Sequence, residues 1–285
     1  MISRFVCVPS ALTLILALAG CNQPTAQPSA TATRVAHSTA TATATTASTP
    51  TTPVPPPPAT TSLASARLTG IVDRVLRAQY SDGFDAAHGC WKAQYGDGDD
   101  ALPYCMRPLP AGAVMENGDQ VIYIATASAS DVEADAYRYG ATDPGMFDAF
   151  RVLVAADGTP SLTSSIRGMD FGSAGDCGCA NADFVQLGPN VHGWVFSSGS
   201  TQQGITTATH ALVAPLGRTF VDVGNIPQYV EGDQDIEYRL TLGSENASDG
   251  WFPITVSKYR NDRRIASQVA RFDRSAKRYV VRQSF

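Results

Sequence analysis

Four cysteines of this 285-residue chain could act together in one chemistry: Cys90, Cys105, Cys177 and Cys179. Thiolates bind soft metals and attack electrophiles, and two thiols can join in a disulfide. Histidines such as His88 could complete a copper or zinc site, but none of the spacings matches a known metal motif. The even number of cysteines suits two disulfides. The compartment decides between these chemistries, because disulfides persist where the environment is oxidising.

A run of carboxylates offers oxygen ligands at alternate positions, in Glu231, Asp233, Asp235 and Glu237. Such alternation resembles the early ligands of a calcium loop, although the glycine at the sixth position and the glutamate at the twelfth are missing. The run is therefore a candidate for a structural calcium ion. Its alternative is the entrance to a strand whose acidic face lies in water. No other cofactor is expected.

Sequence motifs of the common hydrolases are absent after residue 61: there is no Gly-x-Ser-x-Gly, His-Glu-x-x-His or Ser-x-x-Lys pattern. Two carboxylates at the right separation could still hydrolyse a glycan without any motif. We therefore expect a protein without enzymatic activity and keep a carboxylate-dependent hydrolase as an alternative.

The stretch from Gly188 to Gly204 combines an indole with many small polar residues near a turn. This composition is typical of an adaptable binding loop, and equally of an exposed hairpin. The candidate residues for binding a partner are His192, Trp194, Ser200 and Gln202.

The first residues have the composition of an export signal. Arg4 supplies a positive charge, and an apolar run from Ala11 to Leu18 follows it. The run is shorter than the roughly 20 residues of a membrane-spanning helix, so residues 1–20 are predicted to be a signal peptide. Leu18-Ala19-Gly20-Cys21 then resembles the lipobox of bacterial lipoproteins.

This resemblance to bacterial lipoproteins implies that Cys21 is diacylated through its thiol and becomes the first residue after cleavage. The protein would then be held to a membrane in the periplasm. In that family an aspartate after the cysteine often retains the protein in the inner membrane, and Asn22 at this place favours the outer membrane. Residues 21–61 are rich in Thr, Ala, Ser and Pro, and we expect them to form a disordered tether.

An oxidising periplasm favours disulfides for the four cysteines. A bond between Cys90 and Cys105 would close a loop of about 15 residues, stabilise by about 3 kcal/mol and staple the Gly- and Asp-rich excursion 82–106. Cys177 would then pair with Cys179. In the alternative, Cys90 and Cys105 each cross to one of that pair.

Residues 62–285 are predicted to form one β-rich domain. Apolar residues from Leu68 to Gln79 recur every three or four positions, which predicts one helix that packs on a sheet. About ten short apolar runs follow, separated by turn residues. This pattern predicts a mainly β fold, an antiparallel sandwich, a barrel or a propeller-like meander.

Charge is unevenly distributed along this domain. It holds 26 acidic and 19 basic residues, and the stretch from Ser257 onward has a net charge of +7 against −14 for residues 62–256. The basic residues of the last strands are expected to pair mostly with the acidic body or to lie in water. Nucleic acid is excluded as a partner because the domain is acidic and exported.

Together these features favour a noncatalytic binding protein, lipid-anchored in the periplasm, with a protein as its partner. Its sharpest form is an inhibitor or immunity protein against an envelope-acting toxin or hydrolase, since the architecture resembles that of immunity lipoproteins in outline. A structural or assembly lipoprotein of the envelope is the first alternative. In that role the basic C-terminal strands would contact phosphate-bearing polymers.

Overall fold

The computed structural model describes residues 65–132, 134–233 and 235–282. Every element described below belongs to one compact unit, Pro57–Phe285. The predicted signal peptide (1–20), the predicted lipidation site Cys21 and the predicted tether (21–61) lie outside the described residues.

One α-helix opens the described chain. Helix α1 (Ser65–Tyr80) buries Ile71 and Leu76, which belong to the apolar stripe that predicts the helix, and Tyr80, which follows the stripe. These side chains pack on one face of the first sheet, and the helix is therefore confirmed both in place and in its packing. Within the described part of the chain, no helix has the length and hydrophobicity needed to span a membrane.

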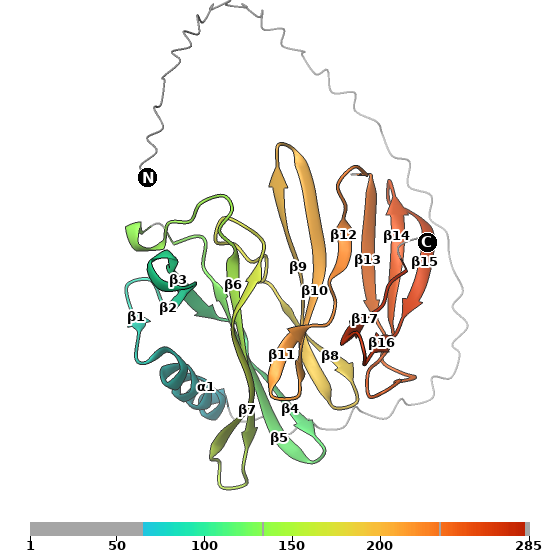
Figure 1. The fold of residues 1–285 in the computed structure, drawn as a ribbon. Helices are drawn as coiled ribbons and strands as arrows, with labels where there is room; N and C mark the ends of the chain where they lie inside the picture. The colour runs from blue at the N-terminus through green and yellow to red at the C-terminus, as the bar shows by residue number, and fades with distance from the viewer. Residues whose placement is uncertain (1–64, 133, 234, 283–285) are drawn as a thin grey trace, which may run out of the picture. The chain divides into compact units, whose positions relative to one another are not determined.

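The first sheet has seven antiparallel strands in the order β1-β2-β3-β5-β6-β7, with β4 paired to β5 (Figure 1). Two 3-10 turns, η1 (Gly98–Asp100) and η2 (Asp135–Tyr137), lie in its connections. The strands are β1 (Phe84–Asp85), β2 (Cys90–Tyr95), β3 (Leu102–Pro108), β4 (Gly112–Glu116), β5 (Asp119–Ser128), β6 (Gly145–Val154) and β7 (Pro160–Phe171).

Three smaller sheets follow. The order is β11-β10-β9-β8 in the second sheet, with β12 also paired to β10, and β13-β14-β15 in the third, and β16 pairs with β17. These strands are β8 (Asp183–Gly188), β9 (Val191–Gln202), β10 (Ile205–Leu216), β11 (Thr219–Asp222), β12 (Ile226–Tyr229), β13 (Ile236–Leu242), β14 (Ile254–Arg260), β15 (Arg263–Ala270), β16 (Phe272–Asp273) and β17 (Arg278–Tyr279).

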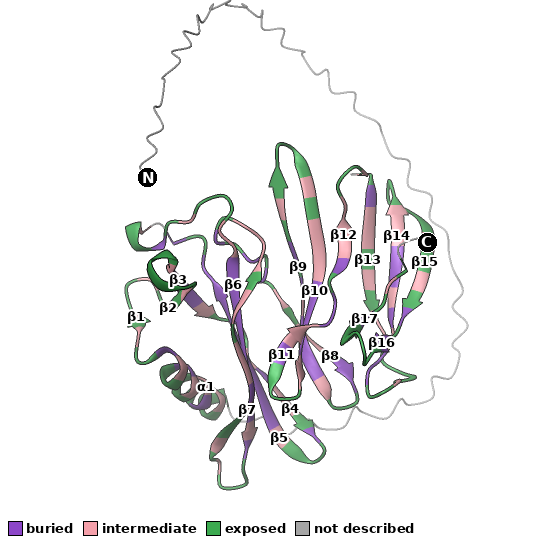
Figure 2. Cartoon of the chain, viewed as in Figure 1, coloured by how far each residue is buried: buried purple, intermediate pink, exposed green. Residues whose placement is uncertain are grey.

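Among the strands that are buried on both faces, β5 and β10 join the layers. In β5, Tyr123 faces the core shared with the second sheet, whereas Ile122 and Ile124 face the core under α1. In β10, Val213 faces the first of these cores and Leu212 faces the core shared with the third sheet. Figure 2 shows β5 and the later half of β10 buried in the middle of the molecule. The layers are thus α1, the seven-stranded sheet, the five-stranded sheet and the three-stranded sheet.

The structure confirms the mainly β fold with one helix, and none of the described sheets closes into a barrel. It corrects the strand assignment in two ways. The excursion 82–106 contains β1, β2 and most of β3 of the largest sheet. Three strands, β4, the twelve-residue β7 and β12, lie where no apolar run predicts one.

Both disulfides are intramolecular and local. Cys90 on β2 pairs with Cys105 on β3, and Cys177 pairs with Cys179. This is the first of the two pairings considered from the sequence. The bond between Cys90 and Cys105 joins neighbouring strands and lies in a small core with Val132 and Tyr137.

Removing each disulfide tests how much it stabilises the fold. Because loop closure costs more entropy in longer loops, the bond between Cys90 and Cys105 should stabilise by about 3 kcal/mol, and the short Cys177–Cys179 ring by about 1 kcal/mol. All four cysteines are fully buried, so the alanine variants lose comparable packing. In urea, Cys90→Ala/Cys105→Ala should lose about 2 kcal/mol more unfolding free energy than Cys177→Ala/Cys179→Ala. Equal losses would contradict this account.

Candidate functional site

In β9 and β10, the two longest strands of the second sheet, one half carries large apolar side chains and the other half carries small or polar ones. Strand β9 carries Trp194 and Phe196 in its first half and then runs Ser197-Ser198-Gly199-Ser200. Strand β10 has the reverse order, with short Thr and Ala residues first and the buried run from Ala211 to Ala214 later. The large residues fill the cores, whereas the small residues leave the space between the sheets unfilled at the other end of the hairpin.

A groove of about 830 Å³ lies where these small side chains face the edge strand β7. Strand β12 and the turn after it complete the groove, because β12 pairs with β10. Its lining includes Met169, Asp170 and Phe171 of β7, Ser198, Ser200 and Thr207 of the hairpin, and Pro227, Tyr229 and Glu231.

A smaller hollow of about 320 Å³ continues the groove toward the tip of the hairpin. Ser200, Thr207 and Glu231 line both the groove and the hollow. Gln202 lines the hollow but not the groove. The structure therefore brings together Ser200 and Gln202, which were expected to bind a partner, with Glu231 from the predicted calcium run. The hairpin tip is exposed (Figure 2).

The groove combines three kinds of surface. Met169, Phe171 and Tyr229 are half-buried and offer apolar and aromatic area, while the serines and threonines offer hydroxyl donors and acceptors. Glu231 adds negative charge and forms no ion pair with any residue that the structure describes. The Asp170 side chain lies on the opposite face of β7, because Asp170 pairs with Met146 of the core under α1. An apolar floor with hydroxyls and an acidic rim suits a polypeptide segment that carries Lys or Arg.

His192 and Trp194 belong to the protein interior and not to an exposed binding loop. Trp194 is 0% exposed and His192 is 9% exposed, because alternation along β9 points both rings toward the seven-stranded sheet. Nδ1 of His192 lies 3.0 Å from Oε1 of Glu116. Only Ser200 and Gln202 of the four candidate residues line a surface hollow.

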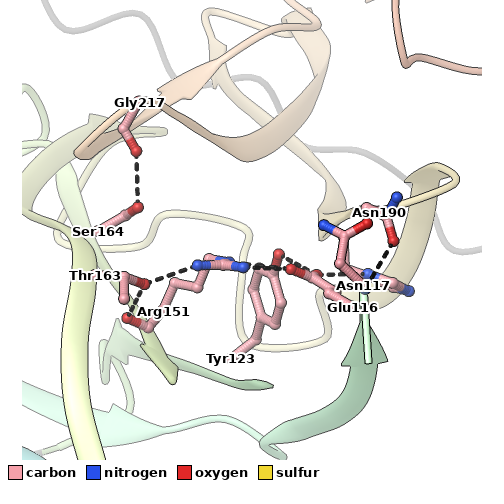
Figure 3. A network of polar contacts seen from close by, with 9 residues as sticks. Glu116, Asn117, Tyr123, Arg151, Thr163, Ser164, Asn190 and Gly217 are labelled. Atoms are coloured by element: carbon pink, nitrogen blue, oxygen red, sulfur yellow. Dashed lines mark hydrogen bonds and ion pairs between the residues drawn. The ribbon is translucent and has the colours of Figure 1, made fainter. Parts of the chain in front are cut away.

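Glu116 is the centre of a buried polar network (Figure 3). Its carboxylate accepts hydrogen bonds from the Tyr123 hydroxyl at 2.7 Å and from Nη2 and Nε of Arg151 at 2.5 and 3.2 Å. Burial alone raises the pKa of Glu116, but the hydrogen bonds from His192, Arg151 and Tyr123 outweigh it and hold this pKa below its ordinary value. The network ties β4, β5, β6 and β9 together.

A second buried carboxylate, Asp148 on β6, is also fully engaged. The hydroxyls of Tyr80 and Tyr95 each donate to Oδ2 at 2.5 Å, and the Gly168 amide donates to Oδ1 at 2.7 Å. Arg167 lies 3.5 Å from Oδ2 and covers the Tyr80 ring at 4.7 Å. Burial raises the pKa of Asp148. This network attaches α1 and β7 to the sheet, and the carboxylate is closed to solvent.

The four predicted calcium ligands do not converge. Glu237 pairs with Arg239, Asp233 lies 3.7 Å from Arg260, and Glu231 lines the groove. Across residues 65–282, leaving aside 133 and 234, no three His, Cys, Asp or Glu side chains are grouped to hold a metal ion. The residues of β7 that line the groove were missed from the sequence, since β7 itself was not predicted.

Comparison with protein-family models, with curated proteins and with solved structures finds no match for this chain. The site is therefore interpreted from its own geometry.

Glu116→Gln tests the buried network. The pKa of Glu116 is lower in the folded protein than its ordinary value of 4.5, so its ionised carboxylate stabilises the fold. This contribution to the free energy of unfolding is complete above pH 4.5 and is lost as the pH falls through the folded-state pKa. In urea at pH 7 the variant should be about 2 kcal/mol less stable, because Arg151 loses its charged partner. Its stability should also fall less than that of the wild type between pH 5 and about pH 3.

Asp119→Asn is the matched control for this variant, because Asp119 is an exposed carboxylate on the same hairpin. It should follow the wild type at each pH. A Glu116→Gln profile parallel to that of the wild type would show that the network does not hold the charge of Glu116.

Proposed function

We propose that this chain is a lipid-anchored binding protein of the periplasm that captures a protein partner in the groove beside β7. Its sharpest form is an inhibitor or immunity protein against an envelope-acting toxin or hydrolase. The observation that carries the proposal is the groove itself, with its half-buried aromatic residues, its hydroxyl groups and its acidic rim.

The chemistry of the groove selects the kind of partner. Phe171 and Tyr229 can pack against one or two apolar side chains, and Ser198, Ser200 and Thr207 can exchange hydrogen bonds with a backbone. Glu231 favours a segment that carries Lys or Arg. The net charge of −14 on residues 62–256 would speed association with a basic protein.

The two buried carboxylates give no support to the alternative of a hydrolase. Glu116 and Asp148 are almost fully buried, and each accepts several hydrogen bonds from neighbouring side chains or the backbone. A catalytic carboxylate must reach its substrate, and these two groups instead stabilise the packing of strands.

The lipid anchor has its own test at Cys21, and the lipobox resemblance supports it. Acyl chains on Cys21 would bury far more apolar surface than a marginal single chain does. Wild-type protein should stay with membranes after a carbonate wash, whereas Cys21→Ser should be soluble or remain unprocessed, which electrophoretic mobility reveals. A processed Cys21→Ser protein that stays with washed membranes would disprove the anchor.

Partner capture tests the groove. The unit Pro57–Phe285 is immobilised, and proteins that it retains from cell extract are identified by mass spectrometry. We expect a basic envelope-acting protein, and Glu231→Gln should weaken its binding about fivefold, mainly through slower association. Glu245→Gln removes one exposed carboxylate outside the groove and should bind normally. Equal weakening by both variants would place the interface elsewhere.

A further inference from the structure

Most basic residues of the C-terminal strands form no ion pair with the acidic residues that the structure describes. Arg260 lies 3.7 Å from Asp233, and Arg274 lies 3.3 Å from Asp249. Six other exposed cations form no ion pair with any residue in the described ranges: Arg263, Arg264, Arg271, Lys277, Arg278 and Arg282. The positive charge of this region is therefore directed mainly to solvent, and not to the acidic body.

Three arginines come together at one place on this surface. Arg271, Arg274 and Arg282 line a hollow of about 920 Å³ beside the β16–β17 hairpin. Val269 and Val280 line the same hollow, and they are 61% and 47% exposed. The hollow thus combines three guanidinium groups and two carboxylates with exposed aliphatic side chains.

The backbones that carry two of these arginines are held in place. The Val280 amide donates to the Arg271 carbonyl oxygen at 3.3 Å, next to the pairing of Phe272 with Tyr279. The Gln268 side chain bonds both the amide and the carbonyl of Arg282, each at 3.2 Å. Arg271 and Arg282 are therefore presented on a preformed frame.

Two acidic residues, Asp249 and Asp273, also line the hollow, and both are already engaged. Oδ1 of Asp273 accepts bonds from the amide and hydroxyl of Ser275 at 2.7 and 2.6 Å and from the Ala276 amide at 3.0 Å. Asp249 is paired with Arg274. The guanidinium groups of Arg271 and Arg282 remain available for an external anion.

We propose that this hollow docks on the phosphate of an anionic phospholipid headgroup at a membrane surface. Planar guanidinium groups pair with phosphate through two hydrogen bonds at once, and two arginines can hold one phosphate group. Val269 and Val280 then contact the apolar boundary beneath the headgroups. The net charge of +7 after Ser257, against −14 for the body, orients this face toward an anionic surface. The hollow shares no residue with the groove, so the two can act independently.

Vesicle co-sedimentation tests this proposal on the unit Pro57–Phe285, which contains every core described above and lacks Cys21. The vesicles are equal parts phosphatidylglycerol and phosphatidylcholine, or phosphatidylcholine alone. We expect binding to the anionic vesicles only. Arg271→Ala/Arg282→Ala should weaken it about 30-fold, given the usual contribution of each arginine near an anionic surface.

Arg263→Ala/Arg264→Ala is the matched control, because it removes the same charge from exposed cations at the other end of β15. This variant should weaken binding only a few fold, and circular dichroism confirms that both variants fold. Equal weakening by the two pairs, or no preference for phosphatidylglycerol, would overturn the proposal. Calorimetry with inorganic phosphate adds a third arm. Phosphate binding that Arg271→Ala/Arg282→Ala abolishes, without vesicle binding, would assign the hollow to a soluble phosphate and overturn the membrane proposal.

Discussion

The burial of β5 and β10 on both faces is the constraint on which the rest of the structure depends. Each strand supplies alternate side chains to two different cores, so neither could lose a neighbouring layer without exposing a row of apolar residues. The stack of one helix and three sheets follows from this requirement. Because β5 is central in its sheet and β10 in the next, the two strands hold the layers in register.

The groove follows from the same constraint. Trp194, Phe196 and Val213 fill the space between the first two sheets at one end, and the serines and threonines of the same hairpin cannot fill it at the other. The β9–β10 hairpin thus has two roles. The large apolar side chains of one half fill the core, and the small polar side chains of the other half line the groove. The buried carboxylates Glu116 and Asp148 hold this arrangement, because each joins strands that are distant in sequence.

A helix or strand could be predicted from the sequence where its apolar residues recur at a regular spacing or form a clear run. The stripe of α1 and the apolar runs of β5 and β10 mark elements that are buried deeply, and these were found. Strand β7 was missed because Pro160–Phe171 is an edge strand with mixed burial, rich in Ser and Thr. Strands β2 and β3 were hidden among the glycines and aspartates of 82–106.

The candidate site was predictable only in part, for a related reason. Small polar residues near a turn indicate an exposed hairpin, and Ser200 and Gln202 do line a surface hollow. Composition does not say which residues of a strand face inward, so His192 and Trp194 were placed on the surface although alternation along β9 buries them. The other wall of the groove comes from β7, which lies about 30 residues before the small polar residues of β9 in the sequence. Only the packing of the two sheets brings these segments together.

The most direct test of the central claim is hydrogen–deuterium exchange of the Pro57–Phe285 unit, alone and with its captured partner. The account predicts new protection of amides in 166–172, 198–209 and 226–231, which line the groove from β7, β9, β10 and β12. Protection confined to other segments, with these three unchanged, would contradict the groove as the binding surface.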